Sequence, residues 1–175
     1  MKDKLVFVDA ETDGLYGMFL SVAMVVTDSK GKEILDSLYI GLRNVEKLAT
    51  EPWVRENVIG KMGNYESCDD ETELLERAWS FWMKYAETSY AVADVQYPVE
   101  ARLFRKCVEK KPKERQWNAP FPLLDLSTVL FWEGYDPLIN RLELQKEIDK
   151  TEVHNALNDA KVTASVWNNL QRGKK

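Results

Sequence analysis

Apolar runs in the first forty residues predict three β-strands. The runs cover residues 5–9, 19–28 and 34–42, and a polar turn containing Gly31 joins the last two as in a hairpin. The first run, Leu-Val-Phe-Val, is apolar on both faces. A strand of this kind belongs in the interior of a sheet.

Helical spacing of apolar residues dominates the rest of the chain. It predicts helices over residues 51–62, 69–87, 98–110 and 155–170, a strand over 89–94, and a strand followed by a helix within 120–132. Asp69 or Asp70 is suited to cap the second of these helices. Strands that first follow one another and then alternate with helices predict an α/β fold, with a mixed β-sheet flanked by α-helices. We expect residues 1–175 to form a single domain.

Composition and charge narrow the functional classes. No apolar run is long enough to span a membrane, and an acidic residue interrupts any signal-peptide core, so we expect a cytoplasmic protein. Cys68 and Cys107 lack the spacing of metal ligands and are expected to be free thiols. The net charge of −5 gives no global basic footprint for duplex binding. The basic residues within 102–115 could form a local patch, although such runs are more often a solvated helix face.

Two acids, Asp9 and Glu11, lie one residue apart after the first apolar run. Strand alternation directs both side chains to one face, with Ala10 opposite. Two close carboxylates repel each other and raise each other's pKa, and a hard divalent cation removes this penalty. Because acids at strand ends are usually just solvated, the pair alone is a weak indication of a metal site.

His154, the only histidine, is followed five residues later by Asp159. If both residues were helical, they would lie roughly 140° apart around the helix. A shared centre therefore requires His154 to lie just before the helix begins. A lone histidine is more often structural than catalytic, but this spacing combined with Asp-x-Glu at the other end of the chain is much rarer.

The segments D-A-E-T-D-G-L and H-x-x-x-x-D resemble the DEDDh branch of the 3'-5' exonucleases. These are the relatives of proofreading exonuclease subunits, ribonuclease T and oligoribonuclease. The resemblance covers nearly the whole chain in the right order. It implies a ribonuclease-H-like fold and a metal-dependent 3'-5' exonuclease acting on the 3' end of single-stranded DNA or short RNA. It also allows a homodimer, although the sequence contains no interface signal.

The middle motif departs from the family pattern. Where the family has His-Asn and then Phe-Asp opening a helix, this chain has V-A-D-V-Q-Y-P-V-E-A-R-L-F. Alignment of the helix gives Glu100 the aspartate position, whereas alignment of the strand end gives it to Asp94. The sequence leaves both open.

The resemblance further implies a two-metal mechanism with Mg²⁺ or Mn²⁺. Two ions roughly 4 Å apart would clamp the phosphodiester. Asp9 would bridge the ions, Glu11 and Asp159 would hold one of them, and Asp94 or Glu100 would complete the other. His154 would accept the proton of the attacking water.

The residues after the first motif are candidates for substrate contacts. Thr12, Gly14 and Leu15 correspond to family positions that contact the terminal nucleotide, although Gly14 could serve only a turn with positive φ. Trp53 could offer a stacking surface to a single-stranded 3' end. We expect Asp125 to cap the helix that follows it and not to act as a further site acid.

Two other functions remain open. The unusual middle motif and the acidic charge allow a catalytically weak or inactive nucleic-acid-binding module of the same fold. A metal-dependent phosphohydrolase acting on a small nucleotide would also suit a chain without a large basic surface.

Overall fold

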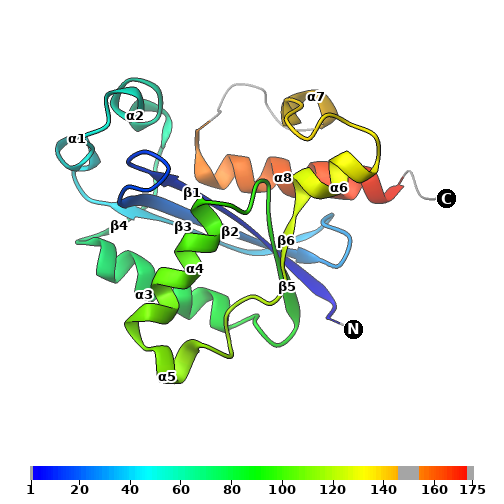
Figure 1. The fold of residues 1–175 in the computed structure, drawn as a ribbon, viewed down its shortest axis with the longest axis horizontal. Helices are drawn as coiled ribbons and strands as arrows, with labels where there is room; N and C mark the ends of the chain where they lie inside the picture. Colours follow the sequence, from blue (N-terminus) through cyan, green and yellow to red (C-terminus); the bar gives the residue numbers. More distant parts are fainter. Residues whose placement is uncertain (1, 146–153, 173–175) are drawn as a thin grey trace.

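The computed structural model describes residues 2–145 and 154–172, which are built around a six-stranded mixed sheet (Figure 1). The strands are β1 (Lys4–Thr12), β2 (Phe19–Asp28), β3 (Ile34–Leu42), β4 (Glu66–Cys68), β5 (Ser89–Ala93) and β6 (Leu123–Asp125). Their order in the sheet is β4-β3-β2-β1-β5-β6. β1, β2 and β3 form an antiparallel meander, whereas β5 pairs parallel with β1, β6 with β5 and β4 with β3. β1 lies in the interior of the sheet, as its apolar pattern predicts.

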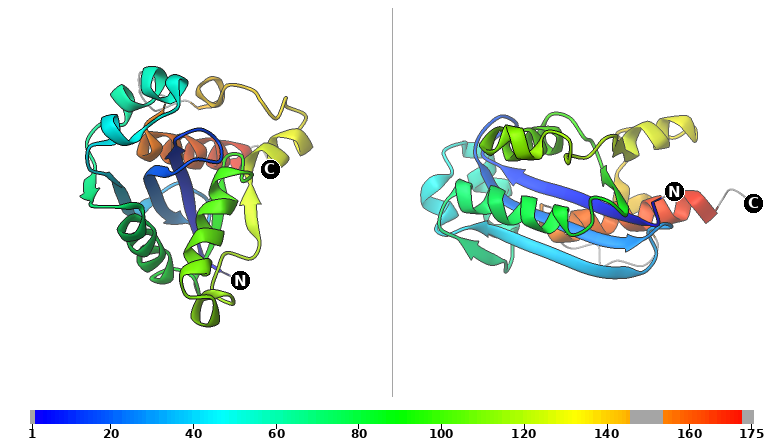
Figure 2. Two further views of the ribbon diagram at one scale, coloured as in Figure 1. Left: turned by 60° about the vertical axis from the view of Figure 1, so that its left-hand side comes forward. Right: turned by 90° about the horizontal axis from the view of Figure 1, so that it is seen from below.

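Helices cover both faces of this sheet. They are α1 (Val45–Leu48), α2 (Pro52–Asn57), the 3₁₀ turn η1 (Ile59–Lys61), α3 (Glu71–Met83), α4 (Val99–Lys110), α5 (Pro112–Arg115), α6 (Leu126–Trp132), α7 (Arg141–Leu144) and α8 (Ala156–Arg172). α3 and α4 lie on one face and α8 lies on the other (Figures 1 and 2). The predicted mixed sheet flanked by α-helices is confirmed.

Alternate residues of β1 fill the two hydrophobic cores. The even-numbered apolar positions pack in the larger core with α3 and α4. Leu5 and Phe7 pack on the opposite face against Ala160 of α8. Asp9 and Glu11 continue this odd-numbered register, because side chains two residues apart share a face. β1 therefore carries both acids to the side of the sheet that α8 covers.

Several elements differ from the prediction. β1 begins one residue earlier and ends three residues later than predicted, because residues from Lys4 to Thr12 pair with β2. The predicted helix over 51–62 is wrong in part, since it divides into α2 and η1 at Val58, shortly before the weak helix former Gly60. α1, α5, α7 and β4 were not predicted, because elements of three or four residues carry no readable periodicity.

Two aspartates begin helices as predicted. The Asp70 carboxylate accepts a hydrogen bond from the backbone N–H of Glu73 in α3, at 2.9 Å. The Asp125 carboxylate accepts one from Thr128 in α6, at 2.8 Å. Each satisfies an N–H group that the first turn of a helix leaves unpaired.

Cys68 and Cys107 are both buried and free, as predicted. Within the described ranges, no helix has the length and apolar character needed to cross a lipid bilayer.

Candidate active site

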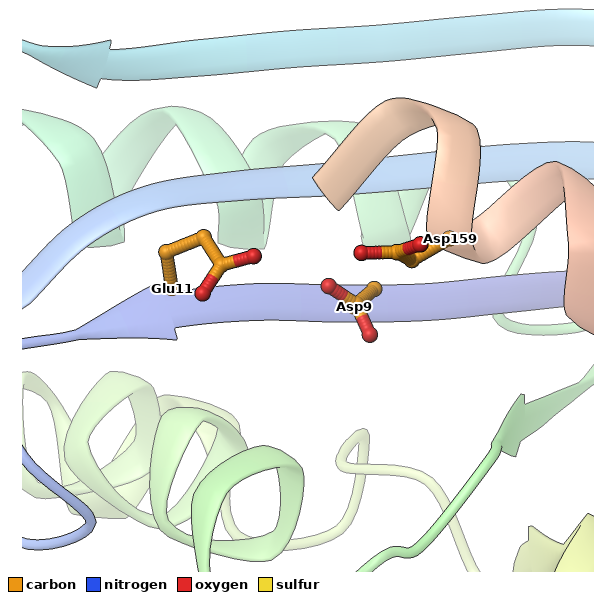
Figure 3. A group of neighbouring side chains, drawn as sticks. All are labelled: Asp9, Glu11 and Asp159. Carbon is orange, nitrogen blue, oxygen red and sulfur yellow. The ribbon is translucent and has the colours of Figure 1, made fainter. Parts of the chain in front are cut away.

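Three carboxylates from the two ends of the chain meet over β1 (Figure 3). Asp9 and Glu11 come from β1, and Asp159 comes from the first turn of α8. One carboxylate oxygen of each residue lies within 4.8 Å of the others. The shared face of β1 explains the first two positions, and the packing of α8 on that face brings in the third.

His154 lies directly before α8, with its backbone in the left-handed region at φ 67°. Its N–H donates to Oδ2 of Asp159 at 3.0 Å. Asn155 then caps the helix by accepting from the N–H of Asn158 at 3.1 Å. The histidine thus has the position outside the helix that a shared centre with Asp159 requires.

These residues line one cavity of about 300 Å³. Asp9, Glu11, Asp159 and His154 contribute to its wall, and so does Asp94. The cavity is therefore strongly acidic. Four of the predicted site residues and one of the two alternative middle acids face the same space.

Burial and mutual repulsion raise the pKa values of the clustered carboxyls. Burial, with the charge of Asp159, raises the pKa of Glu11 to about 7. Burial raises the pKa of Asp159 to about 6, and the charge of Asp94 adds to this effect. The pKa of Asp9 is raised well above its ordinary range by burial and then by the charges of Glu100 and Glu11. A divalent cation would relieve this repulsion, and converging carboxylates are suitable ligands for Mg²⁺ or Mn²⁺.

Asp94, directly after β5, is paired with a buried arginine. Nε of Arg141 donates to Oδ1 of Asp94 at 2.7 Å. Burial raises the pKa of Asp94, and the hydrogen bond and charge of Arg141 oppose that shift. Asp94 already has a cationic partner, which makes it the poorer candidate for a metal ligand.

Glu100 lies at the second position of α4 and is only 6% exposed. Its carboxylate accepts a hydrogen bond from the backbone N–H of Ala10, beyond the point where the pairing of β1 with β5 ends at Val8. Burial raises the pKa of Glu100 to about 8. No salt bridge to Glu100 occurs within residues 2–145 and 154–172. Of the two middle acids, only Asp94 lines the acidic cavity, but Glu100 has no salt-bridge partner among the described residues and has the stronger influence on the pKa of Asp9.

The His154 ring is held in the form that can accept a proton. Burial, followed by the positive charge of Lys61, lowers its pKa below the ordinary value. The imidazole is therefore neutral at physiological pH. The Trp53 ring packs edge-on against it, with ring centroids 5.5 Å apart and an interplanar angle of 89°. Trp53 itself remains 53% exposed, so its free face is accessible to a ligand.

The predicted substrate contacts surround a second cavity, of about 510 Å³. Thr12, Gly14, Leu15 and Trp53 all line it, and Glu11 lines both cavities. Gly14 has φ 74°, as the turn reading expected. The second cavity is more apolar in character and adjoins the acidic one, which is a suitable arrangement for a base next to a phosphate.

Two residues of the basic run within 102–115 join α4 and α5 to α3. Lys106 contacts Glu71 of α3 at 2.7 Å, and Arg115 pairs with Glu76 of the same helix. Neither basic residue lines the acidic cavity. These contacts favour the interpretation of this run as a solvated or structural surface over its interpretation as a nucleic-acid patch.

Arg141 is the site residue that sequence reasoning missed. It lines the acidic cavity from α7, which has only four residues and no periodicity. The one available signal was Asn140, which caps α7 by accepting from the N–H of Leu142 at 3.0 Å. That signal predicts a helix start but gives no indication of an active-site arginine.

Solved nuclease structures share this fold. The zinc-bound complex of Escherichia coli exonuclease I with single-stranded DNA has a TM-score of 0.67 at 12% identity, over 99% of this chain and 41% of that chain. A full-length 3'-exonuclease has a TM-score of 0.64 at 14% identity, over 98% of this chain and 83% of that chain. The nuclease domain of 3'hExo, a DEDDh family member bound to rAMP, has a TM-score of 0.54 at 14% identity, over 98% and 93%.

No protein-family model and no curated protein sequence matches the chain. The structural likeness, at these low identities, establishes the fold. The expected fold, a mixed sheet flanked by helices, is confirmed as the fold of these nucleases, one of which is a DEDDh family member. The chain spans less than half the length of Escherichia coli exonuclease I.

Proposed function

We propose that this protein is a metal-dependent 3'-5' exonuclease that hydrolyses the phosphodiester bond at the 3' end of single-stranded DNA or short RNA. The observation that carries the proposal is the convergence of Asp9, Glu11 and Asp159 on one cavity that His154 also lines. A cluster of unpaired acids is costly to bury unless cations are bound there. The fold shared with 3'-exonucleases supports the same conclusion.

In this proposal Asp9, Glu11 and Asp159 would hold a divalent ion, Mg²⁺ or Mn²⁺. Glu100, in preference to Asp94, would help to hold a second ion with Asp9, because its charge raises the pKa of Asp9 more than that of Asp94 does. When bound, such ions stabilise the charge that develops on the phosphate and lower the pKa of water.

His154 accepts the proton of the attacking water on its neutral imidazole. The hydrogen bond from its backbone N–H to Asp159 holds the backbone of His154, and the edge-on contact with Trp53 restricts the ring. These contacts limit how far the base can move from the attacked phosphate.

The terminal nucleotide occupies the adjoining cavity. Leu15, 61% exposed, and Trp53 present apolar surface on which a base can stack, and Gly14 lies with positive φ directly before Leu15. The class of substrate is also supported by two neighbours whose structures contain single-stranded DNA and rAMP. The expected homodimer is untested by any of these findings and stays a prediction.

The test is to incubate the protein and Mn²⁺ with single-stranded DNA and RNA oligonucleotides labelled at the 5' end. We expect a ladder that shortens from the 3' end, which disappears with EDTA and in Asp159→Asn. Binding without cleavage would favour the inactive nucleic-acid-binding module. Release of phosphate from a mononucleotide, without a ladder, would favour the small-nucleotide phosphohydrolase.

A further inference from the structure

Arg141 is the one lysine or arginine among the described residues that lines the acidic cavity. The rest of the charged wall consists of carboxylates and a neutral histidine, which offer little attraction to an anionic ligand. An isolated cation in such a wall has two possible roles. It can form a structural ion pair with the protein, or it can in addition bind an anionic ligand.

Three hydrogen bonds fix the Arg141 guanidinium. Nε donates to Asp94 at 2.7 Å, Nη2 donates to the carbonyl of Pro137 at 2.8 Å, and Nη1 donates to the carbonyl of Ile139. Only 11% of the side chain is exposed. The group is therefore held in one orientation before any ligand arrives, which removes most of the entropic cost of using it.

Two N–H groups of this guanidinium have no hydrogen-bond partner within residues 2–145 and 154–172. An arginine has five N–H donors, and the three bonds above use one each on Nε, Nη1 and Nη2. The remaining donors are one on each terminal nitrogen. Two neighbouring N–H groups on a planar cation match two oxygens of a phosphate.

We propose that Arg141 binds the non-bridging oxygens of a nucleic-acid phosphate in the acidic cavity, and that Asp94 is the positioning residue that orients it. The inference rests on the proposed function, because it takes the 3' end of a single strand as the occupant of the cavity. It also gives Asp94 a role that needs no metal. The acid at the end of β5 holds the cation that meets the phosphate.

The experiment measures whether Arg141 and the phosphate charge depend on each other. A single-stranded DNA oligonucleotide is compared with one whose 3'-terminal linkage is a neutral methylphosphonate. Binding is followed by fluorescence anisotropy with Mn²⁺, in a His154→Asn background that slows cleavage. Arg141→Gln, Arg141→Lys and Asp94→Asn are each introduced into that background. Arg105→Gln is the matched control, because Arg105 is exposed and pairs with Glu109 on the outer surface of α4.

With Arg141 present, the methylphosphonate should weaken binding by roughly ten- to hundredfold, the value of a hydrogen-bonded charge pair. In Arg141→Gln that penalty should shrink to the part that Mn²⁺ alone contributes, and in Asp94→Asn it should also fall. Arg105→Gln should keep the full penalty. An equal penalty with and without Arg141 overturns the inference. If Arg141→Gln does not fold, Arg141→Lys decides the question, because one ammonium cannot replace the two fixed donors and the penalty should still be smaller.

The two proposals fail separately in this design. A 3'-shortening ladder with equal methylphosphonate penalties overturns the role of Arg141 and leaves the exonuclease intact. A penalty that depends on Arg141, in a protein that makes no ladder, overturns the exonuclease and supports the phosphate site. A protein that neither binds nor cuts the oligonucleotide overturns both.

Discussion

The left-handed backbone of His154 makes the choice of substitution at this residue important. Asparagine tolerates φ near 60° better than alanine does, so His154→Asn removes the imidazole with less strain on the start of α8. We expect turnover to fall by about a hundredfold or more, the usual loss for a general base. Mn²⁺ affinity should stay close to that of the unsubstituted protein, because the clustered carboxylates are unchanged. Single-turnover rates and a metal titration measure the two effects, and an unchanged rate would mean that His154 has only a structural role.

Glu100 provides the second prediction at this scale. Glu100→Gln keeps the size of the side chain but removes the neighbouring charge that raises the pKa of Asp9 most. If Glu100 holds a metal ion, Glu100→Gln should lower the cleavage rate by more than the roughly 10- to 100-fold that is typical when a residue only supports a metal ligand. Glu109→Gln makes the same chemical change on the exposed surface of α4 and should leave the rate unaltered. A Glu100→Gln variant with ordinary activity and metal dependence would return the role to Asp94.

At the scale of elements, Asp13 clamps the loop after β1 to the start of α2. Its carboxylate accepts hydrogen bonds from the N–H of Thr50 and Glu51, at 2.8–3.0 Å, and from the Thr50 hydroxyl at 2.7 Å. This clamp sets the position of Leu15 relative to Trp53. Asp13→Ala should cost about 1 kcal/mol of stability, as other helix caps do, and should raise KM more than it lowers kcat. Asp70→Ala removes a similar cap from α3, away from the cavities, and should cost stability without changing KM.

How far the sequence predicts the structure also depends on the length of each element. β2 and β3 have the predicted bounds, because both are nine or ten residues long, are rich in strand-forming residues and are joined by a polar turn that contains Gly31. α7 is too short for such a pattern, so Arg141 was not recognised. The sequence could not decide between Asp94 and Glu100 either, because the choice depends on Arg141, which lies 47 positions from Asp94 in the chain. Sequence motifs identify the acids, but the three-dimensional pairing determines which of them is unpaired.

At the scale of the whole molecule, the acidic cluster joins residues from the two ends of the chain, and their mutual repulsion opposes folding. α8 packs on the face of β1 through Phe7 and Ala160, so apolar contacts hold Asp159 against Asp9 despite their repulsion. The sequence could predict this meeting only through the motif spacing at both termini. The magnitude of the repulsion follows from burial, which no sequence pattern reports.

That repulsion makes the stability of the metal-free protein depend on pH. Burial raises the pKa of Glu11 to about 7 and that of Glu100 to about 8, from ordinary values of 4.5. Between the ordinary and the raised pKa values the folded state binds more protons than the unfolded state, so the free energy of unfolding falls as pH rises.

In EDTA, Glu11→Gln should therefore raise Tm more at about pH 8 than at about pH 5.5, where the native glutamate is already protonated. The comparison with the variant cancels other groups, such as Asp13, whose pKa is raised by burial but lowered below its ordinary value by the combined hydrogen bonds from Glu51 and Thr50. Mn²⁺ should reverse the order at pH 8, because the ion stabilises the ionised cluster and Glu11→Gln removes one of its ligands. A Tm difference that is the same at both pH values would show that these carboxyls do not repel one another. A Tm difference that Mn²⁺ leaves unchanged would show that they do not bind the cation.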